Sequence, residues 1–298
     1  MTVMIILDKI HHHDVLLGLK SLADNSADCV LIDPPYNIGK NFMTSKDNMA
    51  LADYVVWCEA WLQESLRIAK PGASIFIYGF SEILARLAVL RPLALQRWLV
   101  WHYTNKNVAS LQFWQRSHES ILLTWKDTDK PIFYRDAVRE PYTDGFLKGA
   151  AGKTRAATKG RFSSGDKSTV YEAHQGGALP RDVIKVPALA GGAGMRERWF
   201  FCENCDDVFP GIDKHSHDSH VLIFHPTQKP LELTKRLLYS CMPKNGLVVV
   251  PFAGTGSECA MAAYLDYQFI GFDNNPVYAK MGNDLITKNQ QFCEHIKK

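Results

Sequence analysis

Short, mostly apolar runs alternate with segments of helical periodicity near both ends of the chain, and this alternation limits the folds available to it. Four such runs lie at residues 29–32, 74–78, 247–250 and 268–272. Each is too short for a buried helix and is followed by proline, glycine or aspartate, so we interpret them as buried strands. Apolar residues at helical spacing fill residues 51–70, 230–241 and 257–265. Strands that alternate with helices predict an α/β fold with a doubly wound, mostly parallel sheet.

The middle of the chain has a different composition. Residues 126–224 are rich in Gly, Ala, Ser and Thr and contain few long apolar runs. A chain of 298 residues is long enough for one large α/β domain that carries an insertion. We therefore predict that residues 1–125 and 225–298 form one domain and that residues 126–224 are a loop-rich insert.

The sequence Asp33-Pro34-Pro35-Tyr36 directly follows the first predicted strand. Ligands of open α/β sheets bind at the carboxyl ends of the strands. The two prolines fix the turn, so that the Asp33 carboxylate and the Pro34 carbonyl are held in place, and Tyr36 adds a flat aromatic face. Two acceptors beside an aromatic plane suit the exocyclic amino group of a flipped base. An ordinary strand-terminating turn, in which Asp33 caps a backbone, is the alternative.

A glycine turn follows the apolar run at residues 247–250. Gly254 and Gly256 allow the backbone to approach a ligand closely, and the next predicted strand ends in Asp273, where a carboxylate can hold ribose hydroxyls. This pattern indicates an adenosine-containing cofactor but does not distinguish a dinucleotide from another one. A tight connection without a ligand is the alternative.

The sequence His225-Pro226-Thr227-Gln228-Lys229-Pro230 leads into a predicted helix. Thr227 and Lys229 there offer a hydroxyl and an ammonium to a carboxylate. A capping stretch with no ligand remains the alternative for this motif.

Taken together and in this order, the three motifs resemble those of the DNA amino-methyltransferases, which use S-adenosyl-L-methionine to methylate exocyclic amines of bases. The order resembles the β class of that family, with Asp-Pro-Pro-Tyr first and the Phe-Ala-Gly-Thr-Gly turn last. The resemblance covers residues 10–125 and 225–285. It implies a Rossmann-like methyltransferase fold in which residues 126–224 form an inserted target-recognition region.

The resemblance also implies roles for single residues. The catalytic residues would be Asp33, Pro34, Pro35 and Tyr36: Asp33 and the Pro34 carbonyl would accept the amine hydrogens while Tyr36 stacks on the base. Cofactor contacts would come from Phe252, Gly254 and Gly256 around the methionine part, Asp273 at the ribose, and Thr227 and Lys229 near the carboxylate.

One position departs from the family pattern. Similar proteins carry Asp immediately before Pro-Phe, where this chain has Val250. We expect either that Asp14 or Asp33 replaces the missing contact to the cofactor, or that cofactor affinity is weakened.

Asp rather than Ser at position 33 favours adenine N6 as the methylated amine, and cytosine N4 is the alternative. Two other classes stay open. One is a DNA-binding relative with weakened catalysis, suggested by Val250. The other is a nicotinamide-dependent enzyme built on Gly254 and Asp273.

The net charge of +3 excludes a uniformly basic nucleic-acid coat but not a basic patch. Residues 146–185 hold eight Lys or Arg and three acidic residues. We predict DNA-backbone contacts for Lys148, Lys153, Arg155, Lys159 and Arg161, with a solvated charged loop as the alternative. The expected partner is double-stranded DNA. The resemblance adds two candidate partners, a second copy of the chain and the endonuclease of a restriction–modification pair.

The seven cysteines lie mostly in apolar segments, which predicts reduced thiols and a cytoplasmic protein, nucleoid-associated if bacterial. No run of 18 apolar residues predicts a membrane span. Cys202-x2-Cys205 with His215, His217 and His220 is close to structural zinc patterns but has a shorter middle spacing. We interpret it as a strand that contains cysteine followed by a polar loop, and predict no metal site.

Overall fold

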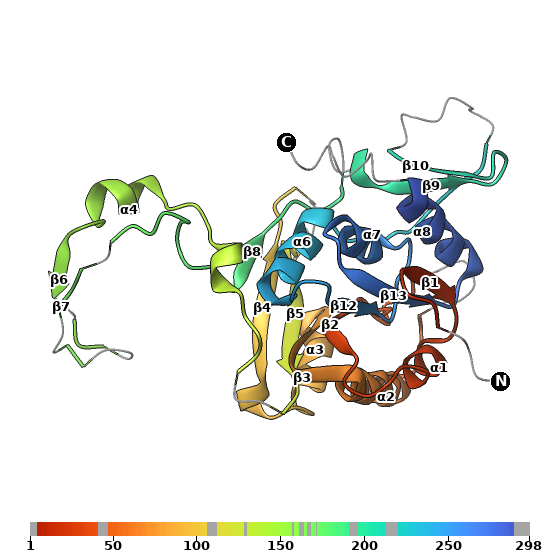
Figure 1. Cartoon of the computed structure of the whole chain (residues 1–298), viewed down its shortest axis with the longest axis horizontal. Helices are drawn as coiled ribbons and strands as arrows, with labels where there is room; N and C mark the ends of the chain where they lie inside the picture. Colours follow the sequence, from red (N-terminus) through yellow and green to blue (C-terminus); the bar gives the residue numbers. More distant parts are fainter. Residues whose placement is uncertain are drawn as a thin grey trace. The chain divides into compact units, whose positions relative to one another are not determined.

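The computed structural model describes residues 5–40, 47–105, 112–127, 130–156, 158–160, 164–165, 168–170, 172–190, 196–211 and 220–288. The chain divides into two compact units (Figure 1). One unit comprises residues 1–132 and 182–298, and the other comprises residues 133–181.

An eight-stranded sheet forms the centre of the first unit. Its order is β1 (Lys9–His12), β13 (Gln268–Asp273), β12 (Leu247–Val250), β2 (Ala27–Ile32), β3 (Ala69–Gly79), β5 (His118–Trp125), β4 (Gln96–His102) and β8 (Val183–Lys185). β5 runs antiparallel to both of its neighbours, and every other neighbouring pair is parallel. The prediction of a mostly parallel sheet is confirmed.

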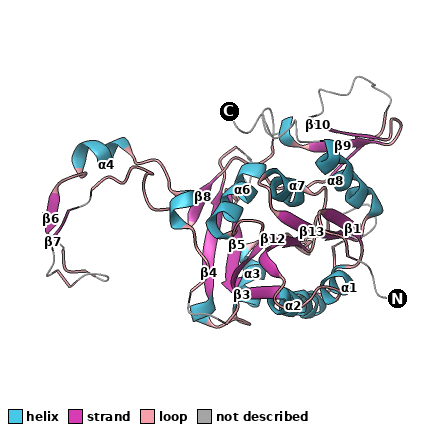
Figure 2. Ribbon diagram, in the orientation of Figure 1, coloured by secondary structure: helices cyan, strands magenta, loops and turns pink. Residues whose placement is uncertain are grey.

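Helices cover both faces of this sheet (Figure 2). On one face pack α1 (Val15–Lys20), α2 (Leu51–Ile68) and α3 (Ser81–Ala88), and on the other pack α6 (Leu231–Cys241) and α7 (Ser257–Tyr264). Successive residues of a strand point to opposite faces, so Leu31 of β2 joins one core and Ile32 joins the other. Because both faces of the sheet are covered by helices, residues on both sides of a central strand are buried, which explains why the four predicted strand segments are apolar at nearly every position. Predicted helix 51–70 ends two residues early, because Ala69 pairs with Ala27 and begins β3.

A second, three-stranded sheet belongs to the same unit, in the order β10 (Asp207–Pro210), β9 (Trp199–Cys202) and β11 (Leu222–Phe224). Trp199 and Ile223 of this sheet share a core with Met281 and Leu285 of α8 (Pro276–Lys288). The predicted insert of residues 126–224 is thus wider than the second compact unit. Its last part supplies β8 and this small sheet, whose strands of three or four residues are too short to show a period.

The described part of residues 133–181 carries little regular structure. Helix α4 (Asp144–Gly149) and the antiparallel pair β6 (Thr154–Ala156) and β7 (Ser168–Val170) lie in this unit. Its two ends are held together by an isolated bridge between Glu140 and Ala178. In the part of the chain that the structure describes, no helix has the length and apolarity needed to cross a membrane.

Candidate active site

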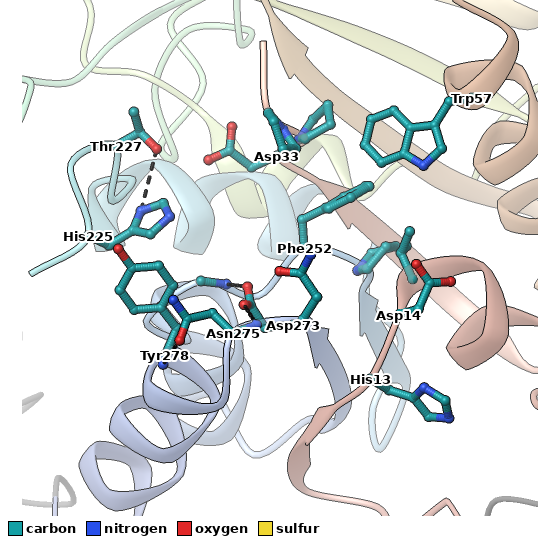
Figure 3. A pocket seen from close by; sticks show the side chains of 16 residues that line it. His13, Asp14, Asp33, Trp57, His225, Thr227, Phe252, Asp273, Asn275 and Tyr278 are labelled. Carbon is teal, nitrogen blue, oxygen red and sulfur yellow. Dashed lines mark hydrogen bonds between the residues drawn. The ribbon is translucent and has the colours of Figure 1, made fainter. Parts of the chain in front are cut away.

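A cavity of about 200 Å³ lies at the carboxyl edge of the parallel strands (Figure 3). Its walls include residues at or just after the ends of four strands: Asp14 after β1, Asp33 after β2, Phe252 after β12 and Asp273 at the end of β13. Parallel strands end at one edge, so residues far apart in sequence meet there. Residues of the first two motifs, including the ribose-binding candidate Asp273, therefore line one cavity.

A buried charge network holds Asp33. The Lys229 Nζ donates to both oxygens of the Asp33 carboxylate, at 2.7 and 2.8 Å, and lies 3.7 Å from Glu119 Oε2. The Tyr36 hydroxyl lies 2.9 Å from Asp33 Oδ1 and 3.1 Å from Glu119 Oε2, and its one hydrogen can be donated to only one of them at a time. The Lys229 side chain is only 2% exposed. One ammonium thus faces two carboxylates away from water.

Burial and charge act in opposite directions on this pair. Burial raises the pKa of the Asp33 carboxyl above its ordinary value, and the Lys229 ammonium works against that shift. Burial lowers the pKa of Lys229, but the carboxylates of Asp33 and Glu119 outweigh it, so the pKa of Lys229 is raised. Lys229 is therefore the main group that favours the ionised form of Asp33, and the Tyr36 hydroxyl adds to its effect.

Acceptor positions remain on Asp33 and its neighbour. Asp33 Oδ1 lies within hydrogen-bonding distance of both Lys229 and Tyr36, whereas Oδ2 accepts only from Lys229 among the described residues. Each carboxylate oxygen can accept about two hydrogen bonds, so Oδ2 keeps one position. The Pro34 carbonyl accepts no hydrogen bond from a described residue, and Pro34 lines the cavity with Asp33. Two acceptors therefore follow each other at the end of β2.

Tyr36 is placed differently from the expected open stacking face. Its side chain is buried and meets the Phe80 ring edge-on, with ring centroids 5.1 Å apart. It borders a smaller cavity that also touches Pro34 and Thr227. In this arrangement the Tyr36 hydroxyl positions Asp33, and its stacking on a base stays a prediction.

Of the predicted cofactor contacts, six line the cavity: Asp14, Asp33, Thr227, Phe252, Gly254 and Asp273. Lys229 and Gly256 do not. The Lys229 ammonium is engaged with Asp33 and does not face the cavity that the cofactor carboxylate was expected to enter. Thr227 lines the cavity, and its hydroxyl lies 3.4 Å from His225 Nδ1.

The glycine turn is built around Asp273. Asp273 Oδ2 accepts from the Gly254 N–H and Oδ1 from the Asn275 N–H, both at 2.8 Å, and burial raises the pKa of this carboxyl to about 6. Gly256 is the N-cap residue of α7 and has a φ of 77°, and a Cβ there would lie 2.5 Å from Ile10 Cδ1. Gly256 therefore allows the turn to pack closely against Ile10. The Asp273 oxygens each accept one backbone hydrogen bond from the described residues and keep further lone pairs for a ligand.

Aromatic rings and Asp14 form another wall. Phe252 packs edge-on against Trp57, with centroids 5.5 Å apart, and both rings line the cavity. Asp14 Oδ1 caps α1 by accepting from the N–H groups of residues 16 and 17, and its second oxygen makes no bond to a described residue. Val250 is buried in the core. Asp14 is thus the carboxylate on this wall of the cavity.

Sequence reasoning missed several residues of the site. Trp57, His225 and Tyr278 line the cavity, and Glu119 contacts Lys229 and Tyr36. Burial lowers the pKa of His225 to about 3, so this imidazole is neutral. Glu258, behind the glycine turn, has its pKa raised to about 7 by burial. His225 opens the third motif and Trp57 fits a helical spacing that indicates a core position, but neither signal predicted a place in the cavity wall.

The predicted DNA-contacting residues belong to the 133–181 unit. Lys148 on α4, Lys153 and Lys159 are exposed, and Lys148 lies 3.8 Å from Asp144. Arg155 lies on β6, and Arg161 lies outside the described residues. Their contact with DNA remains a prediction.

A doubly wound sheet with an Asp-Pro-Pro-Tyr turn beside a cavity at its carboxyl edge defines a site of the amino-methyltransferase kind. Residues 27–284 of the chain match the family model described as DNA methylase, which groups N6 and N4 methyltransferases. The chain belongs to this family, and it is a DNA methyltransferase.

Named relatives agree with this assignment. The Type II methyltransferase M.HpaI of Haemophilus parainfluenzae is 26% identical over 278 residues, which cover 92% of this chain and 72% of that protein. The DNA adenine methyltransferase YhdJ of Escherichia coli K12 is 27% identical over 273 residues, which cover 91% and 80%. Among solved structures, the cytosine-N4-specific PvuII DNA methyltransferase shares the fold with a TM-score of 0.59 at 15% identity, covering 96% of this chain and 91% of that one.

Proposed function

We propose that this chain is a site-specific methyltransferase that transfers a methyl group from S-adenosyl-L-methionine to the N6 amino group of adenine in double-stranded DNA. The observation that carries the proposal is the pair of acceptors at the cavity, Asp33 Oδ2 and the Pro34 carbonyl. The lone pair of an adenine amine is conjugated into the ring, and two acceptors on its hydrogens draw the nitrogen towards a nucleophilic geometry. Positioning and fixed charge of this kind supply most of such a rate.

Adenine is preferred over cytosine on two grounds. Position 33 is Asp rather than Ser, and the relative YhdJ is named as a DNA adenine methyltransferase. The PvuII enzyme is named as cytosine-N4-specific, but its similarity concerns the fold. Cytosine N4 is therefore the other outcome that the experiment below distinguishes.

The cavity fits the proposed cofactor. When bound, S-adenosyl-L-methionine supplies an electrophilic methyl group on a positively charged sulfur. The described residues that line the cavity include the carboxylates of Asp14, Asp33 and Asp273 and no Lys or Arg. Such a lining favours a cationic ligand and disfavours the negatively charged pyrophosphate of a nicotinamide dinucleotide. Asp273 would hold the ribose, Phe252 and Gly254 would lie beside the methionine part, and Thr227 would contact the carboxylate.

DNA contact is assigned to the 133–181 unit. Its exposed Lys148, Lys153 and Lys159 suit a phosphate backbone, and binding through them would weaken steeply with salt. We further propose that the protein acts in the cytoplasm, on nucleoid DNA if its source is bacterial. A homodimer and a cognate endonuclease remain candidate partners.

Sequencing of methylated bases tests the proposal. The chain is expressed in cells whose own DNA lacks base methylation, and their DNA is read for modified bases and digested for nucleoside mass spectrometry. We expect N6-methyladenine at one sequence motif. The Asp33→Asn variant should abolish it, and the matched Asp53→Asn variant, at an exposed position of α2, should not.

N4-methylcytosine at a motif would replace adenine by cytosine in the proposal. A folded wild-type chain that binds the cofactor and DNA but leaves both bases unmodified would contradict the proposed activity and support a catalytically weakened relative.

A further inference from the structure

Two cysteines and a histidine meet at one end of the small sheet. Cys202 ends β9, Cys205 lies in the turn before β10, and His220 lies two residues before β11. The Nδ1 atom of His220 lies 3.4 Å from the Sγ of Cys202 and 3.3 Å from the Sγ of Cys205. The three ligand atoms all lie within 4.8 Å of one another. The interpretation of these cysteines as incidental to a strand does not account for this convergence.

The fold brings these residues together through strand pairing. β9 pairs with β11 in a register that sets Cys202 opposite Leu222, which places His220 beside the β9–β10 turn. The turn is further tied to this strand by the Asn204 Oδ1, which accepts from the Val221 N–H at 3.0 Å. The β9–β10 turn and the segment before β11 are therefore held together by strand pairing and by the Asn204–Val221 hydrogen bond. The three potential metal ligands converge between them.

We propose that Cys202, Cys205 and His220 bind a structural Zn²⁺ ion. In a tetrahedral zinc site with bonds of about 2.3 Å to sulfur and about 2.0–2.1 Å to nitrogen, sulfur and nitrogen ligands lie about 3.5 Å apart. Both observed Sγ–Nδ1 distances are close to this separation. Thiolate and imidazole donors are the set that zinc prefers, and two cysteines separated by two residues are the usual spacing.

One metal ion placed between the three atoms can bind both sulfurs and the nitrogen at the same time. A tetrahedral site takes a fourth donor, which we leave unassigned; His215 and His217, the other histidines of the sequence pattern, lie outside the described residues.

The ion would stabilise a sheet that has little core of its own. Its strands are three or four residues long, which is marginal for an independent sheet. β9 is bonded to the third motif, because the Trp199 N–H donates to Gln228 Oε1 at 3.0 Å, and β11 leads directly to His225 and Thr227 at the cavity. Loss of the ion should therefore loosen one wall of the cofactor cavity.

Metal analysis of the untagged full chain tests the proposal. We expect one zinc per chain. X-ray absorption at the zinc edge should show sulfur ligands at about 2.3 Å and nitrogen ligands at about 2.0 Å from the metal. The Cys205→Ser variant, at an exposed position, should lose the ion and unfold at lower temperature. The matched Cys58→Ala variant, in the core of α2, should keep a full complement of zinc.

Three results would overturn the proposal. The first is a folded wild-type chain that takes up no stoichiometric zinc under reducing conditions with zinc added. The second is full zinc retention by Cys205→Ser. The third is an intact mass lower by two hydrogens with a peptide that links Cys202 to Cys205, which would show a redox disulfide instead. Because the absorption measurement uses the wild-type chain, the test stands even if the variant fails to fold.

Discussion

Replacing Lys229 by Met is the most direct test of the buried charge network. At an effective dielectric constant of about 20, two unit charges about 2.7 Å apart attract by about 6 kcal/mol, and the cost of removing both groups from water offsets much of this. Removing only Lys229 leaves Asp33 and Glu119 buried with no cation between them. Breaking a buried pair in this way costs about 3–5 kcal/mol, so we expect a loss of that size in the free energy of unfolding at neutral pH.

The same change should alter the pH dependence of methyl transfer. The Lys229 ammonium lowers the pKa of Asp33 against the effect of burial, so the pKa rises further without it. The ionised acceptor then forms only at higher pH. We expect transfer at about pH 7 to fall by about 100-fold and to recover in part at about pH 9.

Stability should move in the opposite direction. A carboxyl whose pKa is raised on folding contributes stability that is present below its unfolded pKa and is lost as the pH rises through its folded pKa. The Lys229→Met variant should therefore become less stable at alkaline pH while it becomes more active. A merely unfolded enzyme cannot combine these trends.

Single-turnover transfer of labelled methyl, measured across pH beside urea denaturation, checks both trends. Lys235→Met is the matched control, because this ammonium on α6 lies 3.6 Å from Glu232 on a partly exposed face and should change stability by at most about 1 kcal/mol. A Lys229→Met enzyme with wild-type rates and a wild-type pH profile would refute the assigned role of Lys229.

Four further changes probe the rest of the site. Glu258→Gln should stabilise the protein by about 3 kcal/mol at pH 8. The wild-type carboxyl has its pKa raised to about 7, so the free energy of unfolding falls as the pH rises to that value and the buried group ionises, whereas Gln stays neutral. Urea denaturation at two pH values measures this difference. Gly256→Ala should cost about 2–4 kcal/mol in a thermal melt, since its Cβ would meet Ile10 at a positive φ. Calorimetry should show affinity for S-adenosyl-L-methionine falling below about pH 6 as Asp273 is protonated, whereas a flat profile would exclude Asp273 from binding. Asp14→Asn should keep the α1 cap yet weaken that affinity by about tenfold, and unchanged binding would remove Asp14 as the substitute for the missing Asp.

The sequence predicted what depends on neighbours along the chain. Each buried strand that ends in a turn motif was visible, because proline and glycine mark the end of an apolar run. The pairing of Lys229 with Asp33 was not visible, since it joins residues 196 positions apart. It depends on β2 and the start of α6 meeting at one edge of the sheet, and no local pattern encodes that meeting.

The same reasoning applies to Glu119 and to the cysteine–histidine cluster. Glu119 reaches the network from β5, which joins the sheet antiparallel at the far side of β3, and the sequence gives no sign of that register. Cys202 and His220 meet only because β9 and β11 pair. These strands are too short for their pairing to be predicted from periodicity. The spacing of the ligands in the sequence therefore looked irregular, although the ligand atoms lie close together in space.

The charges at the cavity should make the site bind S-adenosyl-L-methionine more tightly than the thioether product that remains after methyl transfer. Asp14, Asp33 and Asp273 line it together with no Lys or Arg among the described residues, and Lys229 beside Asp33 is engaged by Asp33 and Glu119. The lining is therefore net negative at neutral pH, where Asp273, with its pKa of about 6, is mostly ionised. A methyl donor with a positive sulfur is attracted to such a lining more strongly than the neutral thioether left after transfer. The carboxylates that recognise the cofactor should thus also promote release of the spent one, and neutralising Asp14 should narrow the difference between the two affinities.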